Sequence, residues 1–174
     1  LERRYPGRKI FLSHTTPTGR QAGCERLPGI AGQFYLPLDW CWTMNRMMHH
    51  LQPELIVIGE TELWPNFFRT AKKNGSRLVI VNARISDRSL PRYQLVKSFL
   101  RRVLANVDCI LAQSSVQKER FLSLGADVKK VIVTGNMKFE FSPSTRNDFS
   151  QKLGARFNKD GIGPIMIAAS TMPG

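Results

Sequence analysis

Short apolar runs alternate with longer amphipathic segments along most of this chain. The runs are rich in β-branched residues, which is typical of strands buried on both faces of a sheet. They predict strands over Lys9–Thr15, Phe34–Leu36, Leu55–Glu60, Arg77–Asn82, Asp108–Gln113 and Val131–Thr134. The segments between them predict helices over Arg20–Leu27, Trp40–Leu51, Trp64–Asn74, Ser89–Asn106 and Ser115–Leu124. This alternation predicts an α/β fold, a doubly wound parallel sheet with helices on both faces.

Two of the predicted helices carry further signals. Ser114 is placed to cap the last one, with Gln117 as its reciprocal partner and Gly125 as the terminating residue. The helix over Ser89–Asn106 has one apolar stripe, formed by Tyr93, Val96, Leu100, Val103 and Val107. Its other face carries Arg92, Lys97, Arg101 and Arg102. This basic face is either a solvated surface or a surface turned toward an anion.

The pattern changes after Phe141. We interpret residues 1-141 as one domain, 142-163 as a linker that holds a short helix over Asn147–Phe157, and 164-174 as the first strand of a second, truncated domain. The chain opens with a charged run and without Met, so we expect the natural start to lie upstream.

Charge is the strongest signal in the composition. The chain has 26 Lys and Arg against 13 Asp and Glu, a net charge of +13. This excess indicates an anionic partner, which is nucleic acid, an anionic membrane or a phosphorylated ligand. No apolar run is long enough to span a bilayer. The scattered Cys24, Cys41 and Cys109 favour a reducing compartment, and His49 and His50 lack partners at metal-ligand spacing.

Polar residues gather where the predicted strands end. In parallel α/β sheets, ligands bind in the crevice beyond these carboxyl ends. The candidate residues are Thr16, Thr18 and Gly19 after the first strand, Glu60 and Glu62 after the third, Asn82, Arg84 and Ser86 after the fourth, Gln113 at the end of the fifth, and Asn136 and Lys138 after the sixth.

Each of these groups suits a particular chemistry. The Thr16–Gly19 turn is either a phosphate or sugar site at a helix start or an ordinary cap. Glu60 is expected to face the crevice for acid–base or hydroxyl-binding work, and Glu62 to cap the helix that begins near Pro65. Arg84 and Lys138 suit a phosphate or developing negative charge.

Several motifs are absent. The chain has no GxGxxG after the first strand, no GxxxxGK[ST] and no GxSxG. Dinucleotide binding, P-loop chemistry and a serine nucleophile elbow therefore have no support.

Six blocks together resemble one family. They are Thr16-Pro17-Thr18-Gly19, Leu36-Pro37-Leu38-Asp39, Glu60-Thr61-Glu62-Leu63-Trp64-Pro65-Asn66, Asn82-Ala83-Arg84-Ile85-Ser86, Arg120-Phe121 with Leu124-Gly125-Ala126, and Gly135-Asn136-Met137-Lys138-Phe139. In this order they resemble the signatures of Kdo (3-deoxy-D-manno-octulosonic acid) transferases.

The resemblance implies the Rossmann-like N-terminal half of a GT-B glycosyltransferase. Such an enzyme moves Kdo from CMP-Kdo to a phosphorylated lipid A precursor in lipopolysaccharide assembly, with inversion and without a cofactor or metal. It implies the cytoplasmic side of the bacterial inner membrane, reached peripherally or through an N-terminal anchor, and an anionic membrane surface rather than nucleic acid as partner. Glu60 and Lys138 are implied as catalytic, stabilising the transition state.

The resemblance also predicts what this segment lacks. The family's general base is a Glu in a Ser-Val-Gly-Glu motif before the first strand, so the fragment alone is expected to be inactive. Ser170 and Thr171 resemble a donor-side block in which Met172 replaces the usual His. The alternative hypothesis is a non-catalytic basic module that binds anionic membrane or nucleic acid.

Overall fold

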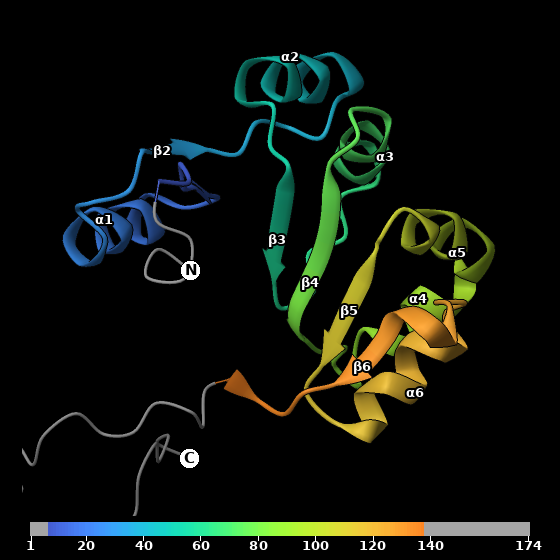
Figure 1. Ribbon diagram of the computed structural model, residues 1–174. Helices are drawn as coiled ribbons and strands as arrows, with labels where there is room; N and C mark the ends of the chain where they lie inside the picture. The colour runs from blue at the N-terminus through green and yellow to red at the C-terminus, as the bar shows by residue number, and fades with distance from the viewer. Residues whose placement is uncertain (1–6, 138–174) are drawn as a thin grey trace, which may run out of the picture. The chain divides into compact units, whose positions relative to one another are not determined.

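The computed structural model describes residues 7–137 (Figure 1). Every strand and helix predicted within this range is present, at closely similar positions. The strands are β1 Phe11–His14, β2 Gly32–Tyr35, β3 Leu55–Gly59, β4 Arg77–Ala83, β5 Cys109–Ala112 and β6 Val131–Val133. The helices are α1 Pro17–Arg26, α2 Cys41–Leu51, α3 Pro65–Lys73, α4 Leu90–Leu95, α5 Lys97–Ala105, α6 Ser115–Ser123 and the 3₁₀ helix η1 Val128–Lys130. The predicted linker, the Asn147–Phe157 helix and the strand within 164-174 lie outside the described residues.

All strand pairs are parallel, but the strands form two hydrogen-bonded sheets rather than one. One sheet has the order β1-β2 and the other the order β3-β4-β5-β6. The α/β class with a parallel, Rossmann-type arrangement is therefore confirmed, while the continuity of the sheet differs from the expectation. The difference arises because the apolar pattern marks where strands occur but not which edges pair.

The four-stranded sheet buries one face against α3, α5 and α6. Alternate strand residues, including Ile56, Leu78 and Ile110, join Phe68 and Phe121 in a single apolar core. On the opposite face Leu55, Val57 and Ile132 are exposed. We expected helices to cover both faces of the sheet. Within residues 7–137, helices fully cover only one face of this sheet.

The predicted helix over Ser89–Asn106 is two helices. The backbone of Val96 leaves the helical region, with φ −111° and ψ 25°. Consequently Leu100 and Val103 of the predicted stripe are buried, but Val96 is 48% exposed. Arg92, Lys97, Arg101 and Arg102 are all exposed.

Two of the three end signals predicted for α6 are confirmed. Ser114 Oγ accepts a hydrogen bond from Gln117 N at 3.3 Å, and Gly125 takes the left-handed φ of +93° after α6. The Gln117 side chain does not return to Ser114 but accepts from Ile85 N at 2.6 Å. No helix in the described part of the chain has the length and apolar character required to cross a bilayer.

Candidate functional site

The carboxyl ends of β3, β4, β5 and β6 form one rim, as parallel strands require (Figure 1). Backbone hydrogen bonds between neighbouring strands continue just past the strand ends. Gln113 N donates to Ala83 O at 3.1 Å, and Thr134 N donates to Ala112 O at 3.0 Å. The residues that follow these strands, Glu60, Arg84 and Gln113 among them, are thereby placed on a shared edge.

Two non-glycine residues at this rim have left-handed backbones. Glu60 has φ 58° and Asn82 has φ 53°. Glu60 N is held there by a hydrogen bond to Val81 O at 2.9 Å, and the β4–β5 register shifts between Ile80 and Ala83. Such a backbone costs about 1–2 kcal/mol for a residue with a Cβ. The fold therefore bends both strand ends at a cost in stability and redirects the side chains that follow.

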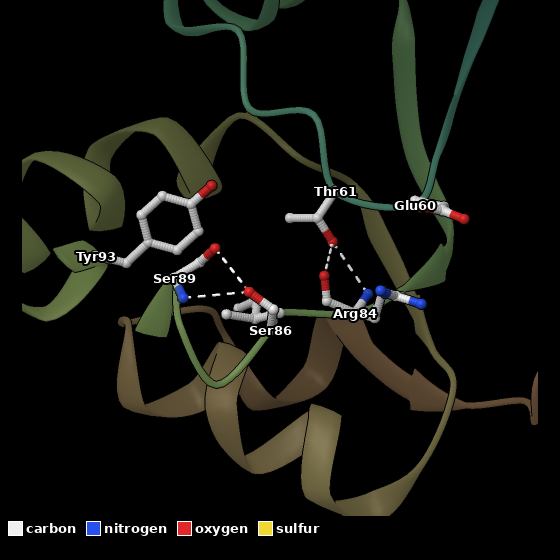
Figure 2. Close-up of a pocket in the computed structure, with 7 residues that line it drawn as sticks. Glu60, Thr61, Arg84, Ser86, Ser89 and Tyr93 are labelled. Atoms are coloured by element: carbon white, nitrogen blue, oxygen red, sulfur yellow. Dashed lines mark hydrogen bonds between the residues drawn. The ribbon is translucent and has the colours of Figure 1, made fainter. Parts of the chain in front are cut away.

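Thr61 joins the β3 and β4 loops. Its hydroxyl donates to Arg84 O and accepts from Arg84 N at 3.0 Å (Figure 2). Both backbone groups of Arg84 are satisfied by one side chain. The backbone of Arg84 is thus held by the loop that carries Glu60.

These loops enclose a pocket of about 140 Å³, lined by Glu60, Thr61, Arg84, Ile85, Ser86, Ser89 and Tyr93. Figure 2 shows Glu60 and Arg84 at one end of the pocket and the Tyr93 ring at the other. Between them, Ser86 Oγ and Ser89 Oγ are hydrogen-bonded to each other at 2.8 Å. A carboxylate, a cation and several hydroxyls in one small space suit a polyhydroxylated, anionic ligand.

A neighbouring pocket of about 250 Å³ shares Arg84, Ile85 and Ser86 with the first and adds Asp87, Gln113, Gln117 and Arg120. Here α6 fixes the loop after β4. Arg120 donates to Ile85 O and forms an ion pair with Asp87. The Arg120 side chain is only 18% exposed, but that of Asp87 is 92% exposed, so water screens this ion pair. The sequence pattern did not single out Arg120 for this role, because its partners lie 33 and 35 residues away along the chain.

Gln113 and Asn82 lie together on this edge. Gln113 Nε2 donates to Asn82 O at 3.2 Å, and Asn82 is buried at 7% exposure. Together they stabilise the bend at the end of β4.

Glu62 does not cap α3. Its Oε2 atom accepts a hydrogen bond from Trp64 Nε1 at 3.1 Å. The cap comes from Asp39, whose two carboxylate oxygens accept from Asn66 N at 3.0 Å and Phe67 N at 2.8 Å. The prediction for Glu62 was wrong because the capping acid is 27 residues away in sequence and becomes adjacent only in the fold.

The Thr16–Gly19 turn sits at the carboxyl end of β1, in the two-stranded sheet. Thr16 Oγ1 caps α1 by accepting from Gly19 N at 3.1 Å, and Thr18 Oγ1 lies 3.4 Å from it. This is the ordinary-cap interpretation for Thr16. The residues that line the two pockets above do not include Thr16, Thr18 or Gly19.

Other predicted positions are placed less fully. Asn136 follows β6 and is partly buried, whereas Lys138, Ser170 and Thr171 lie outside the described residues. His49 and His50 are exposed on α2. Across residues 7–137, no three His, Cys, Asp or Glu side chains are grouped closely enough to ligate a metal ion.

A comparison with protein families decides the classification. Residues 1–141 match the family model described as 3-deoxy-D-manno-octulosonic-acid transferase (kdotransferase). The chain belongs to the Kdo transferase family.

Individual relatives agree with this assignment. A 3-deoxy-D-manno-octulosonic acid transferase of Haemophilus influenzae is 33% identical over 100% of this chain and 40% of its own length. A bifunctional glycosyltransferase/methyltransferase of Fusobacterium nucleatum is 38% identical over 96% of this chain and 26% of its own length. The chain thus spans less than half the length of each of these two relatives.

Solved structures show the fold of this Kdo transferase chain. A UDP-N-acetylglucosamine 2-epimerase has a TM-score of 0.56 at 12% identity, covering 87% of this chain and 48% of its own. A putative epimerase of the same kind from Listeria monocytogenes has a TM-score of 0.54 at 12% identity, covering 84% of this chain and 43% of its own. At such low identity the likeness concerns the Rossmann-type architecture alone.

Proposed function

We propose that this chain forms the acceptor-side part of an inverting glycosyltransferase that moves Kdo from CMP-Kdo to a phosphorylated lipid A precursor. Membership of the Kdo transferase family supports the reaction type. The observation that carries the proposal is the pocket in which Glu60 and Arg84 lie with Thr61 and Ser86 at the carboxyl rim. The proposed setting is the cytoplasmic face of the inner membrane, where a lipid acceptor and a soluble nucleotide sugar meet.

The proposed reaction is a direct displacement. A base removes the proton from an acceptor hydroxyl, whose oxygen forms a bond to the anomeric carbon of Kdo. The bond from that carbon to the CMP phosphate breaks, and CMP leaves with the electron pair. The anomeric carbon carries positive charge in the transition state, and the Glu60 carboxylate would stabilise it. The family's base motif and Lys138 complete the proposed machinery from positions beyond residues 7–137.

Arg84 is assigned to an acceptor phosphate. Its side chain makes no hydrogen bond or ion pair with another of residues 7–137, while its backbone is fixed by Thr61. The hydroxyls of Ser86 and Ser89 line the same pocket and can serve as further donors. A guanidinium with neighbouring hydroxyls matches the charge and the hydrogen-bonding capacity of a phosphate monoester.

The first experiment changes Glu60 in the full-length enzyme. Glu60→Gln keeps the shape and removes the charge, so kcat should fall about a hundredfold, or roughly 3 kcal/mol in barrier height. The matched control is Glu119→Gln, the same change at an exposed carboxylate on α6 outside both pockets. Steady-state kinetics with CMP-Kdo, together with thermal melts, measure both. A normal kcat in Glu60→Gln would refute the catalytic assignment.

The second experiment tests the acceptor contact. Arg84→Gln should raise KM for a phosphorylated acceptor about tenfold or more, because a hydrogen bond to a charged group contributes roughly 1.5–3 kcal/mol. The rise in KM should disappear when the acceptor lacks the phosphate. An equal rise for both acceptors would remove Arg84 from phosphate recognition.

A further inference from the structure

The junction of α4 and α5 exposes more apolar surface than its position in a folded domain requires. We call residues 88–102 the α4–α5 elbow. Leu95 is 87% exposed, the largest fraction for any large apolar side chain in the described part of the chain. Val96 at 48% and Phe99 at 47% extend the exposed apolar surface across the break at Val96. Exposed apolar side chains gathered in this way usually mark an interaction surface.

Cations flank these apolar side chains in the sequence. The elbow carries Arg88, Arg92, Lys97, Arg101 and Arg102, all exposed, and contains no Asp or Glu. The ion pairs among residues 7–137 involve Arg8, Lys72 and Arg120, so none of the five cations of the elbow is neutralised there. A solvated basic face accounts for the cations, but it does not account for Leu95, Val96 and Phe99 among them.

The elbow also forms a wall of the candidate site. Ser89, which precedes α4, and Tyr93, within α4, both line the pocket that holds Glu60 and Arg84. Figure 2 shows both side chains at the end of the pocket opposite Glu60. The same short helix therefore presents polar groups to the pocket and Leu95 to the outside.

We propose that the α4–α5 elbow is the surface by which this protein docks on an anionic lipid bilayer. Exposed apolar side chains and exposed Arg and Lys on the same elbow suit such a surface, since the apolar groups can enter the acyl boundary while the cations remain among anionic headgroups. Each cation near an anionic surface raises partitioning about fivefold, equivalent to ~1 kcal/mol. Nucleic acid would match the cations but leave Leu95 and Val96 in water.

This inference rests on the proposed function for its purpose. A lipid acceptor stays anchored in the bilayer while its phosphorylated sugar reacts. Docking through Leu95 would bring the headgroup layer to the same short helix whose Tyr93 lines the pocket. The reacting sugar would then need little extraction from the membrane.

The first test locates the contact. Hydrogen–deuterium exchange is measured on the full-length protein, with vesicles of phosphatidylcholine containing about one-third phosphatidylglycerol, a strongly anionic surface. Vesicles of phosphatidylcholine alone are the reference. Slower exchange within residues 90–105, specific to the anionic vesicles, is expected. Protection confined to other segments would overturn the proposal, including protection around the exposed Trp40, which precedes α2, and Trp42 on α2.

The second test uses matched variants of the 174-residue chain in vesicle flotation. Leu95→Glu should lower partitioning to anionic vesicles about tenfold, because one apolar contact is lost and one negative charge is added. The control is Val116→Glu on α6, where the native side chain is 60% exposed, and it should bind as the wild type does. Equal losses in the two variants, or no loss in Leu95→Glu, would contradict the proposal.

A second pair of variants tests the contribution of the charges alone. The double variant Arg92→Gln/Lys97→Gln should bind anionic vesicles about 25-fold more weakly, from two fivefold factors. The control double variant Lys73→Gln/Lys129→Gln removes the same charge from exposed sites elsewhere and should change binding far less. Equal weakening in both pairs would indicate general attraction of a basic protein rather than a docking surface. Competition by a short DNA duplex as strong as that by anionic vesicles would instead favour nucleic acid.

Turnover distinguishes failure of this inference from failure of the proposed function. In the full-length enzyme, Leu95→Glu should leave turnover of a water-soluble, deacylated phosphorylated acceptor unchanged and lower turnover of the same acceptor embedded in vesicles. Equal turnover of embedded acceptor by wild type and variant would reject docking through the elbow alone. If the wild type does not use the soluble acceptor, the proposed function fails, and the vesicle-binding results still decide the docking surface.

Discussion

Residues 7–43 and residues 44–137 are stabilised by different kinds of interaction. Every apolar residue of the buried core in the described part of the chain lies at Met44 or later. Within residues 7–43, only His14 and Gly23 are buried. The later region is held by packed side chains, whereas the earlier region is a β-α-β unit with almost no apolar core.

Polar contacts and close backbone approach hold the earlier region instead. His14 Nε2 and Gln33 Oε1 are 2.8 Å apart, and Gly23 of α1 approaches so closely that a Cβ there would lie 2.6 Å from the His14 ring. Two strands and one polar helix are marginal on their own. A strand–helix–strand unit can thus have a regular parallel register and still lack the apolar core that stabilises a domain.

The largest predicted difference between the regions concerns aromatic side chains. Phe68→Ala should lower the free energy of unfolding by about 3–5 kcal/mol, because Phe68 is 0% exposed within the core. Phe11→Ala in β1, where the side chain is 43% exposed, should cost less than about 1 kcal/mol. Urea denaturation of the 174-residue chain measures both. Similar losses would mean that the earlier region has its own core.

A second prediction concerns the link between the regions. Asp39, from the earlier region, caps α3 in the later one through Asn66 N and Phe67 N. Asp39→Ala should therefore destabilise the later region by roughly 1 kcal/mol, the usual effect of losing a cap. Glu62→Gln keeps an acceptor for the Trp64 indole and should leave stability within about 0.5 kcal/mol of the wild type. The reverse order of melting temperatures would restore Glu62 as the cap.

The smallest predicted effect is a pH dependence confined to the later region. Burial alone would raise the pKa of Asp108, but hydrogen bonds from Lys72 and Leu78 N, with the charges of Lys72 and Lys130, lower the pKa below its ordinary 3.8. Because the folded pKa is the lower one, this stabilisation is present above pH 3.8 and is lost as the pH falls through the folded value. The partly exposed ion pair should contribute less than about 1 kcal/mol.

Paired denaturation curves test this dependence. The difference in unfolding free energy between wild type and Asp108→Asn, measured near pH 6 and near pH 3, should shrink at the lower pH. Asp127→Asn, at the acid that caps η1, is a comparison outside this ion pair. A constant difference for Asp108→Asn would show that its charge does not stabilise the fold.

The order and type of the elements followed from local patterns, since apolar periodicity and cap residues act within a few positions. The features that were missed are long-range. Strand pairing, the Asp39 cap and the hold of Arg120 on Ile85 each join residues far apart in sequence. The helix break at Val96 was also missed, because the apolar stripe continues across it with helical spacing.

The candidate site was predictable for a related reason. Residues that follow parallel strands must meet at one rim, so Glu60, Arg84 and Gln113 were grouped correctly without knowledge of the packing. The hydrogen bonds between Thr61 and the backbone of Arg84 were not predicted. Threonine is common in loops, and Arg84 lies 23 residues away in the sequence. The proposed catalytic role of Lys138 and the donor-side roles of Ser170 and Thr171 remain predictions.

The left-handed backbone at Glu60 has a consequence for how this protein can evolve. Glycine adopts φ 58° without the penalty that a Cβ imposes, so a chain selected for stability alone would gain about 1 kcal/mol by replacing Glu60 with glycine. That replacement would also delete the only carboxylate that residues 7–137 contribute to the pocket between the β3 and β4 loops. Retaining a glutamate here opposes thermodynamic optimisation of the fold. Stability screens of this protein should therefore exclude position 60, because the most stable variants they recover there would be those that have lost the site.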